Sequence, residues 1–308
     1  MGVIGLDGGG GLDAGLSVGL SLGMVGLRDG EGKRVAYRSG LELARGCGYR
    51  WVQVNAADAE TRPRDLGRSG VRDVAASARR EGLMVSGVDL FVPMGDFFDG
   101  GKVERAVGAL RDAARFAGEI ASLAGEGPGV LSTVLPRADS APEGRGDEAA
   151  AIVGGVVEEA DRVGVVVADC GWPMEEGRAW GGALGVGVDP AAVVLYGREG
   201  GDGEEGAEGE GAGRSFRRET PGKALARVSG MGLLASARVS DLTSAGRVEA
   251  GEGGLDVMGY VGALAASRWM TGGSVIGGGG RAVVVDLRGI VDGGAAAGRA
   301  LERFRIGL

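Results

Sequence analysis

Short apolar runs alternate with helix-like segments along almost the whole chain, and this alternation limits the choice of folds. The run VGVVVAD (163–169) is rich in β-branched residues, which is typical of a strand buried on both faces. Segment 102–125 instead repeats apolar residues at the helical period, starting with Val103 and Val107. Strand-like runs occupy residues 16–22, 49–56, 83–92, 129–136, 163–169, 185–189, 232–241 and 281–287. Helix-like segments separate these runs, and this order predicts parallel βαβ units.

Eight strands in roughly 300 residues predict a closed (β/α)8 barrel, the TIM barrel, as a single domain over residues 16–308. A doubly wound open sheet is the alternative fold, because it also alternates strands with helices. Glycine, at 66 of 308 residues, is about three times as frequent as in an average protein. Its runs gather in 1–15, 197–213 and 272–280. This grouping predicts glycine-rich loops and a flexible N-terminus over residues 1–15.

One segment, REGGDGEEGAEGEGAGR (198–214), is acidic and of low complexity. Six acids and no base lie between Glu199 and Gly213, so the segment is expected to be a solvated, disordered insertion. It follows the sixth strand and would therefore hang near the carboxyl end of the barrel. Two roles stay open for it: a lid over the barrel mouth, or a neutral surface insertion of the kind that loops tolerate easily.

Charge and cysteine content narrow the partners and the compartment. With 34 basic and 42 acidic residues the formal net charge is −8, which argues against nucleic acid and against an anionic membrane surface. No apolar run approaches the ~18 residues of a membrane span, and the N-terminus lacks the basic region of a signal peptide. Two cysteines cannot form a disulfide framework, so Cys47 and Cys170 are expected to be free thiols in a reducing cytoplasm.

The chain contains no histidine, which removes whole classes of catalytic site. Serine–histidine and cysteine–histidine catalysis are excluded, and a zinc site is not expected. The glycine runs at 8–11 and 277–280 lack the G-x-G-x-x-G spacing, so no nucleotide cofactor is expected either. Any chemistry would have to use carboxylates, Lys, Arg, Tyr, Cys, or a hard metal such as Mg²⁺ or Mn²⁺ bound by carboxylates.

Polar residues stand where the predicted strands end, and in a TIM barrel these ends face the active-site mouth. The candidates at these ends are Gln53, Asn55, Asp89, Asp169, Asp189, Arg238, Asp241 and Asp286. A single aspartate at such a position equally fits a helix cap. Several carboxylates that converge in one cleft, however, require a cation, which would be a divalent metal or Arg238. Trp172, close to Asp169, would flank a ligand or serve in packing.

Four motifs in this order resemble the xylose isomerase-like TIM barrels, the sugar phosphate isomerase/epimerase group that includes endonuclease IV. They are LELARGCGYRWVQVNA (41–56), GVGVDP (185–190), ARVSDLTSAGRVEAGEGGLD (237–256) and AVVVDL (282–287). The resemblance implies a barrel that moves a proton next to the carbonyl of a small sugar or polyol. It also implies a divalent metal held by two Glu, one Asp and one His.

Carried over by position, the resemblance assigns metal-binding roles to three carboxylates of this chain. Asp189 matches the family's aspartate, and Asp286 matches its final glutamate. Asp169 matches the strand-five glutamate, unless the register shifts by one residue and places Ala168 there. The metal-ligating histidine falls on Arg238. A further family histidine, three residues after the sixth-strand aspartate, falls on an alanine, Ala192.

These departures change what the site can do. Asp in place of Glu shortens the reach by about 1.5 Å, whereas metal–ligand distances tolerate only ~0.2 Å. Arginine is always protonated and cannot ligate a metal. We therefore hypothesise that Arg238 supplies the positive charge instead of a metal and pairs with Asp189 or Asp286.

Two functions stay open from the sequence. In the first, the chain is a divergent isomerase or epimerase in which Asp169, Asp189 and Asp286 hold Mg²⁺ or Mn²⁺ or act as bases. Arg238 would then grip a carboxylate, phosphate or enediolate oxygen. The second is a catalytically inactive barrel that binds a small ligand or a protein. In either case Gln53, Asn55, Asp89, Asp241 and Trp172 would line the site of a sugar-like ligand. A DNA-repair nuclease is disfavoured by the net charge and by the missing zinc ligands.

Overall fold

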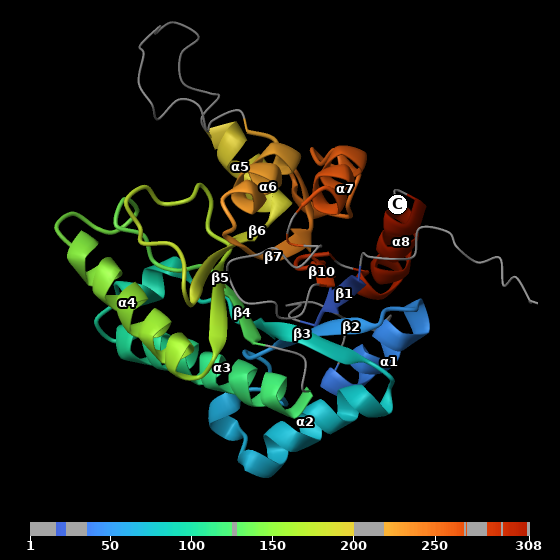
Figure 1. The fold of residues 1–308 in the computed structure, drawn as a ribbon, viewed down its shortest axis with the longest axis horizontal. Helices are drawn as coiled ribbons and strands as arrows, with labels where there is room; N and C mark the ends of the chain where they lie inside the picture. The colour runs from blue at the N-terminus through green and yellow to red at the C-terminus, as the bar shows by residue number, and fades with distance from the viewer. Residues whose placement is uncertain are drawn as a thin grey trace, which may run out of the picture.

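Eight parallel strands close into a barrel in this computed structural model, in the order β1-β10-β7-β6-β5-β4-β3-β2 (Figure 1). The strands are β1 (Ser17–Ser21), β2 (Trp51–Asn55), β3 (Met84–Asp89), β4 (Gly129–Thr133), β5 (Val165–Asp169), β6 (Leu184–Val188), β7 (Leu234–Val239) and β10 (Ala282–Val285). Seven of the eight predicted runs contain one of them, and β6 begins one residue before the predicted run 185–189. The closed order confirms the TIM barrel and shows that the open sheet, the alternative prediction, is wrong.

The structure describes residues 17–22, 36–124, 128–199, 219–267, 269, 282–290 and 292–306. The predicted flexible N-terminus (1–15) and nearly all of the predicted acidic insertion (198–214) lie outside these ranges. Within them, no helix combines the length and the apolar character that crossing a bilayer requires.

Helices cover the outside of the barrel (Figure 1). They are α1 (Tyr37–Cys47), α2 (Arg68–Arg80), α3 (Val103–Ala124), α4 (Gly146–Arg162), α5 (Pro190–Glu199), α6 (Pro221–Gly230), α7 (Val257–Ala265) and α8 (Gly293–Ile306). Short 3-10 turns, η1 (Pro63–Asp65) and η2 (Met94–Phe97), precede α2 and α3. A hairpin of β8 (Asp241–Thr243) and β9 (Gly246–Val248) follows β7. This hairpin was not predicted.

One crossover departs from the regular pattern, because residues 170–183 between β5 and β6 form no helix. Pro173 and three glycines with positive φ, Gly177, Gly181 and Gly182, break any helical run in this loop. Trp180 packs there against both main hydrophobic clusters and fills part of the space that a helix would take.

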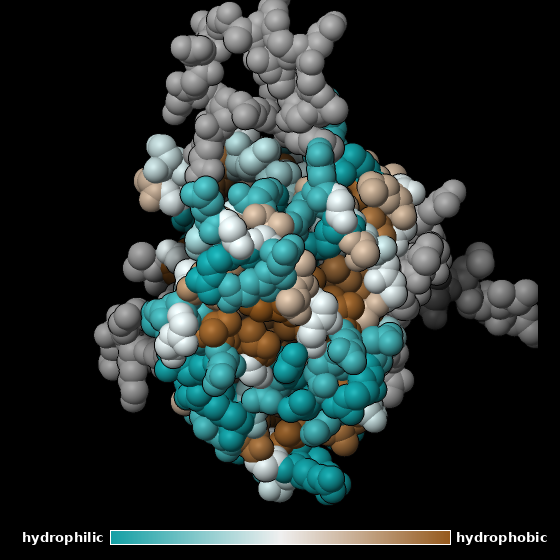
Figure 2. Space-filling view, turned by 90° about the vertical axis from the view of Figure 1, so that its left-hand side faces the viewer, coloured by the Kyte–Doolittle hydropathy of each residue, from teal (hydrophilic) through white to brown (hydrophobic). Residues whose placement is uncertain are grey.

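The side of the molecule with α4 carries an apolar area bordered by hydrophilic residues (Figure 2).

Alternation along the strands decides which side chains enter the barrel. Val166 and Ala168 of β5 pack with Val130 of β4 and Ala235 of β7. Since β4 and β7 are not neighbours in the sheet, these contacts cross the interior. The interior is narrow at the carboxyl end, where a Cβ added to Gly187 would lie 2.4 Å from the Cys170 sulfur. Small residues on β6 thus leave room for larger polar side chains from other strands.

Candidate functional site

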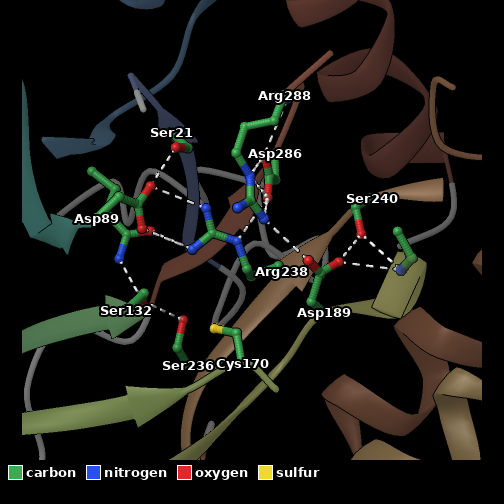
Figure 3. A network of polar contacts seen from close by, with 12 residues as sticks. Ser21, Asp89, Ser132, Cys170, Asp189, Ser236, Arg238, Ser240, Asp286 and Arg288 are labelled. Atoms are coloured by element: carbon green, nitrogen blue, oxygen red, sulfur yellow. Dashed lines mark hydrogen bonds and ion pairs between the residues drawn. The ribbon is translucent and has the colours of Figure 1, made fainter. Parts of the chain in front are cut away.

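Arg238, on β7, lies at the centre of the barrel mouth and is fully buried. Its Nη1 and Nη2 donate to the two carboxylate oxygens of Asp89 on β3, at 2.9 and 3.0 Å. Its Nε donates to Oδ2 of Asp286, after β10, at 3.0 Å. Nη1 also reaches Oε1 of Gln53 on β2 at 3.3 Å. A single guanidinium therefore ties together three other strands of the barrel (Figure 3).

A second layer of contacts surrounds Asp189, which follows β6. Arg247 Nη2 and Arg288 Nη2 donate to its Oδ2 at 2.6 and 3.1 Å, and the Ser240 hydroxyl donates to its Oδ1. Arg288 also donates to Asp286, from Nη2 at 2.5 Å and from Nε at 2.8 Å. We call Asp89, Asp189, Asp286, Arg238, Arg247 and Arg288 the mouth cluster. Its three carboxylates and three guanidinium groups balance in charge.

The electrostatics of the mouth cluster keep its aspartates ionised. Burial by itself would raise the pKa of Asp286, but the guanidinium groups of Arg238, Arg288 and Arg247 hold it well below its usual range. Asp189 behaves alike: burial opposes ionisation, Arg247 and the other arginines outweigh it, and the pKa is lowered. Burial disfavours the charge on Arg238, yet Asp89 and Asp286 raise its pKa. The cluster is thus a set of fixed, opposite charges.

Asp169 does not join the mouth cluster. Its carboxylate accepts from Arg178 at 2.5 Å and from the backbone N–H groups of Leu135 and Gly171 at 3.1 and 3.0 Å. Burial raises the pKa of Asp169, while Arg178 opposes that shift. The inward positions near this end of β5 are Ala168 and Cys170, because side chains alternate along a strand. Of the two residues that the sequence offered for the strand-five position, Ala168 therefore faces the barrel interior and Asp169 does not.

Two other predicted site residues stabilise loops. The Asn55 side chain accepts from the N–H of Ala57 at 3.0 Å and donates to Asp58 at 3.1 Å, closing the turn after β2. The Asp241 carboxylate accepts hydrogen bonds from four backbone N–H groups, those of Leu242, Gly251, Gly253 and Leu255. These bonds fill its acceptor capacity and hold the loop that follows β9.

The remaining predicted residues lie on either side of the mouth. Gln53 joins the contacts of Arg238 and donates to the Ser132 hydroxyl at 2.8 Å. Trp172 packs under the guanidinium of Arg227, at 5.4 Å from its ring centroid. Its indole N–H has no hydrogen-bond partner in the described part of the chain. Trp172 therefore contributes to packing against Arg227 in this structure.

Several residues of the mouth were not among the predicted site residues. Arg288 stands two positions after Asp286, and Ser240 stands two positions after Arg238, so strand alternation could have found both. Arg247 could not be found in this way, because the unpredicted hairpin brings it to Asp189. Phe91 was also missed; its ring centroid lies 3.6 Å from the Arg288 guanidinium carbon and 5.3 Å from that of Arg238.

The donor set of the mouth does not fit a metal ion. Among the described residues, no group of three or more His, Cys, Asp or Glu side chains is placed to hold one. Of the three predicted ligands, Asp189 and Asp286 have oxygens bonded to guanidinium groups, and Asp169 faces elsewhere. The nearby Cys170 thiol has its pKa raised by burial to about 12, so it is not a thiolate ligand.

Comparison with known structures shows the same architecture. A xylose isomerase domain protein from Planctomyces limnophilus superposes with a TM-score of 0.61 at 16% identity, over 94% of this chain and 94% of that one. This chain has the fold of a xylose isomerase-like TIM barrel. In sequence, no protein-family model matches it, and no curated protein matches it. At such low identity, the likeness shows the fold alone.

Two further structures show what this fold holds in other proteins. D-psicose 3-epimerase from Clostridium cellulolyticum H10, solved with D-tagatose, has a TM-score of 0.59 at 12% identity, over 95% of this chain and 99% of that one. The IolI protein, solved with a zinc atom, has a TM-score of 0.54 at 13% identity, over 95% of this chain and 96% of that one. Sugar-processing and metal-binding proteins are thus among the structural neighbours of this barrel.

Proposed function

We propose that the barrel mouth binds a small sugar-like molecule through an anionic group, a carboxylate or a phosphate, and does so without a metal ion. The observation that carries the proposal is the position of Arg238. It stands where the family resemblance expects a metal-ligating histidine, and it is bonded to Asp89 and Asp286. A fixed guanidinium then takes the electrostatic role that a metal would have among these carboxylates.

Arg247 and Arg288 are the groups that would meet the ligand. Their side chains are 24% and 16% exposed, whereas Arg238 is fully buried beneath them. Nη1 of Arg247 is buried and has no hydrogen-bond partner in the described part of the chain; Asp286 Oδ2 is 3.5 Å away. A buried donor without an acceptor destabilises a protein, and a carboxylate or phosphate oxygen is a strong acceptor for a guanidinium. The fold's likeness to a sugar epimerase supports a sugar-like ligand.

The same geometry favours binding over isomerisation. A general base that works near neutral pH needs a pKa near that pH, and the pKa values of Asp189 and Asp286 are lowered instead. Asp169, whose pKa is raised, is bonded to Arg178 and lies outside the mouth cluster. Proton transfer by these three residues, as in the isomerase hypothesis, therefore has no well-placed base.

Calorimetry with three related probes tests this function: glucose 6-phosphate, gluconate and neutral fructose, each with and without EDTA. We expect a charged probe to bind with a Kd below about 1 mM, unchanged by EDTA, and fructose to bind more weakly. Arg247→Gln should weaken that binding by roughly tenfold, because it removes the charged donor. Arg38→Gln, on the exposed face of α1, is the matched control and should have no effect.

A contrary outcome is equally measurable. Fructose or another ketose can be incubated in D₂O with the protein and Mn²⁺, and its C–H signals followed by proton NMR. Exchange of a proton next to the carbonyl that requires both protein and Mn²⁺ would establish the metal-dependent isomerase instead. Binding that needs Mn²⁺, or that Arg247→Gln leaves unchanged, would also overturn the proposal.

A further inference from the structure

Outside the barrel, three adjoining cavities form one continuous groove along α2 and α3. Their volumes are about 320, 200 and 520 Å³. The first two share Arg64 and Asp112 in their walls, and the second and third share Arg68 and Arg115. We call this the α2–α3 groove. None of the six residues of the mouth cluster lines it, although Phe91, whose ring contacts Arg238 and Arg288, lines the first cavity.

The charge of the α2–α3 groove opposes that of the chain. Among the described residues that line it, eight are basic and three are acidic. The whole chain has more acidic than basic residues and a net charge of −8. Seven of the eight basic residues are arginines, the side chain best suited to bidentate contact with carboxylates.

Part of this positive charge is not compensated within the described chain. Five of the eight basic residues form salt bridges with described carboxylates: Arg62 and Arg64 with Asp65, Arg115 and Arg162 with Glu159, and Lys102 with Asp96. Arg68 and Arg72, however, form no salt bridge with any described residue, although they are exposed and stand one helical turn apart on α2. Like charges at this spacing repel each other, so an external anion would stabilise the pair.

Apolar side chains lie between the basic ones. Leu66 and Val71 line the middle of the groove, and Val71 continues with Leu123 into its largest cavity. Leu66 and Leu123 are partly buried rather than fully covered. A ligand that fits would therefore carry both negative charge and apolar groups. That combination is found in acidic peptide segments with interspersed leucine-like residues.

We propose that the α2–α3 groove docks an acidic, partly apolar peptide segment of a protein partner. Charge complementarity favours an anionic partner, and the row of connected cavities favours an elongated one. Nucleic acid fits less well, because the apolar side chains of Leu66, Val71 and Leu123 between the basic ones match leucine-like side chains better than a phosphate backbone.

Fluorescence anisotropy tests this docking with the 308-residue chain. The probe is a labelled peptide of about 15 residues that repeats Glu-Glu-Leu; a Glu-Glu-Ser peptide and an oligothymidylate of similar length are the comparators. We expect binding of the first peptide in roughly the micromolar range, weaker binding of the other two, and loss of affinity as salt is added. Arg68→Glu/Arg72→Glu should weaken binding about tenfold or more.

The control is Arg38→Glu/Arg50→Glu, which changes the charge equally at exposed sites outside the groove and should leave affinity within about twofold. Should the double variant unfold by circular dichroism, Arg105→Glu tests the other end of the groove and should also weaken binding. The proposal is overturned if the Glu-Glu-Leu peptide does not bind, if the groove and control variants behave alike, or if the oligothymidylate binds more tightly.

Discussion

Both the mouth cluster and the α2–α3 groove contain arginines, but the two regions differ in whether these arginines are buried and paired or exposed. At the mouth, Arg238 is fully buried and bonded to two aspartates. In the groove, Arg68 and Arg72 are exposed and form no salt bridge with described residues. Burial of an uncompensated charge is severely destabilising, whereas water screens an exposed one. An arginine inside the barrel thus stabilises its neighbours, and an exposed one is available to a partner.

The largest effect on stability is expected from replacing the buried arginine, Arg238. Arg238→Met should lower the free energy of unfolding by roughly 3–5 kcal/mol, because Arg238 is the one salt-bridge partner that the buried Asp89 carboxylate has among the described residues. Denaturant unfolding measures the change. Exposed Arg38→Met is the control, expected within about 0.5 kcal/mol of the wild type. A loss below about 1 kcal/mol for Arg238→Met would show that the cluster is solvated or compensated elsewhere.

A smaller effect should appear as pH falls. The pKa of Asp286 is lower in the folded state than in the unfolded chain, so its contribution is complete above the unfolded value near ~3.9 and is lost as pH drops below it. Between about pH 6 and pH 3, the wild type should therefore lose about 1 kcal/mol more stability than Asp286→Asn, and the difference should grow as the pH falls further. Urea unfolding at a series of pH values measures both slopes.

Exposed Asp73→Asn, on α2, is the control for this pH series and should keep the wild-type slope. Equal slopes for the wild type and Asp286→Asn would mean that Asp286 titrates alike in both states, and the charge pairing described for it would be wrong.

The smallest effect on stability is expected from replacing the exposed arginines of the α2–α3 groove. Arg68→Ala/Arg72→Ala should change the free energy of unfolding by no more than about 0.5 kcal/mol, with stabilisation the favoured sign because the like-charge repulsion is removed. The measurement is the same denaturant titration. A loss above about 2 kcal/mol would show that these arginines stabilise the fold itself and are not free for a partner.

Most of the fold could be predicted from the sequence because it depends on local periodicity. Val71, Val74, Ala75 and Ala78 of α2 recur at the helical period, and all four are buried. The β5–β6 connection was not predicted as irregular, although Pro173 and its glycines signal it. The β8–β9 hairpin was missed because its strands have only three residues each, too few for a period to show.

The site was harder to predict, because a strand end fixes a position but not the direction of its side chain. Asp89, Asp189, Asp286 and Arg238 face inward and meet, and the hypothesised pair of Arg238 with Asp286 is present at 3.0 Å. Arg238 does not pair with Asp189, the other hypothesised partner; that carboxylate bonds to Arg247 and Arg288. Asp169, one residue out of phase with the inward positions, shows how a shift of one residue changes the face.

Metal analysis tests the central claim, that a guanidinium replaces a metal ion among the mouth carboxylates. The protein would be expressed with added Mn²⁺, Mg²⁺ and Zn²⁺, purified, and its metal content measured by mass spectrometry alongside its melting temperature with and without EDTA. We expect well under about 0.1 metal ion per chain and a melting temperature unchanged by chelation. About one ion per chain that is lost in Asp189→Ala, with a melting temperature lowered by EDTA, would contradict it.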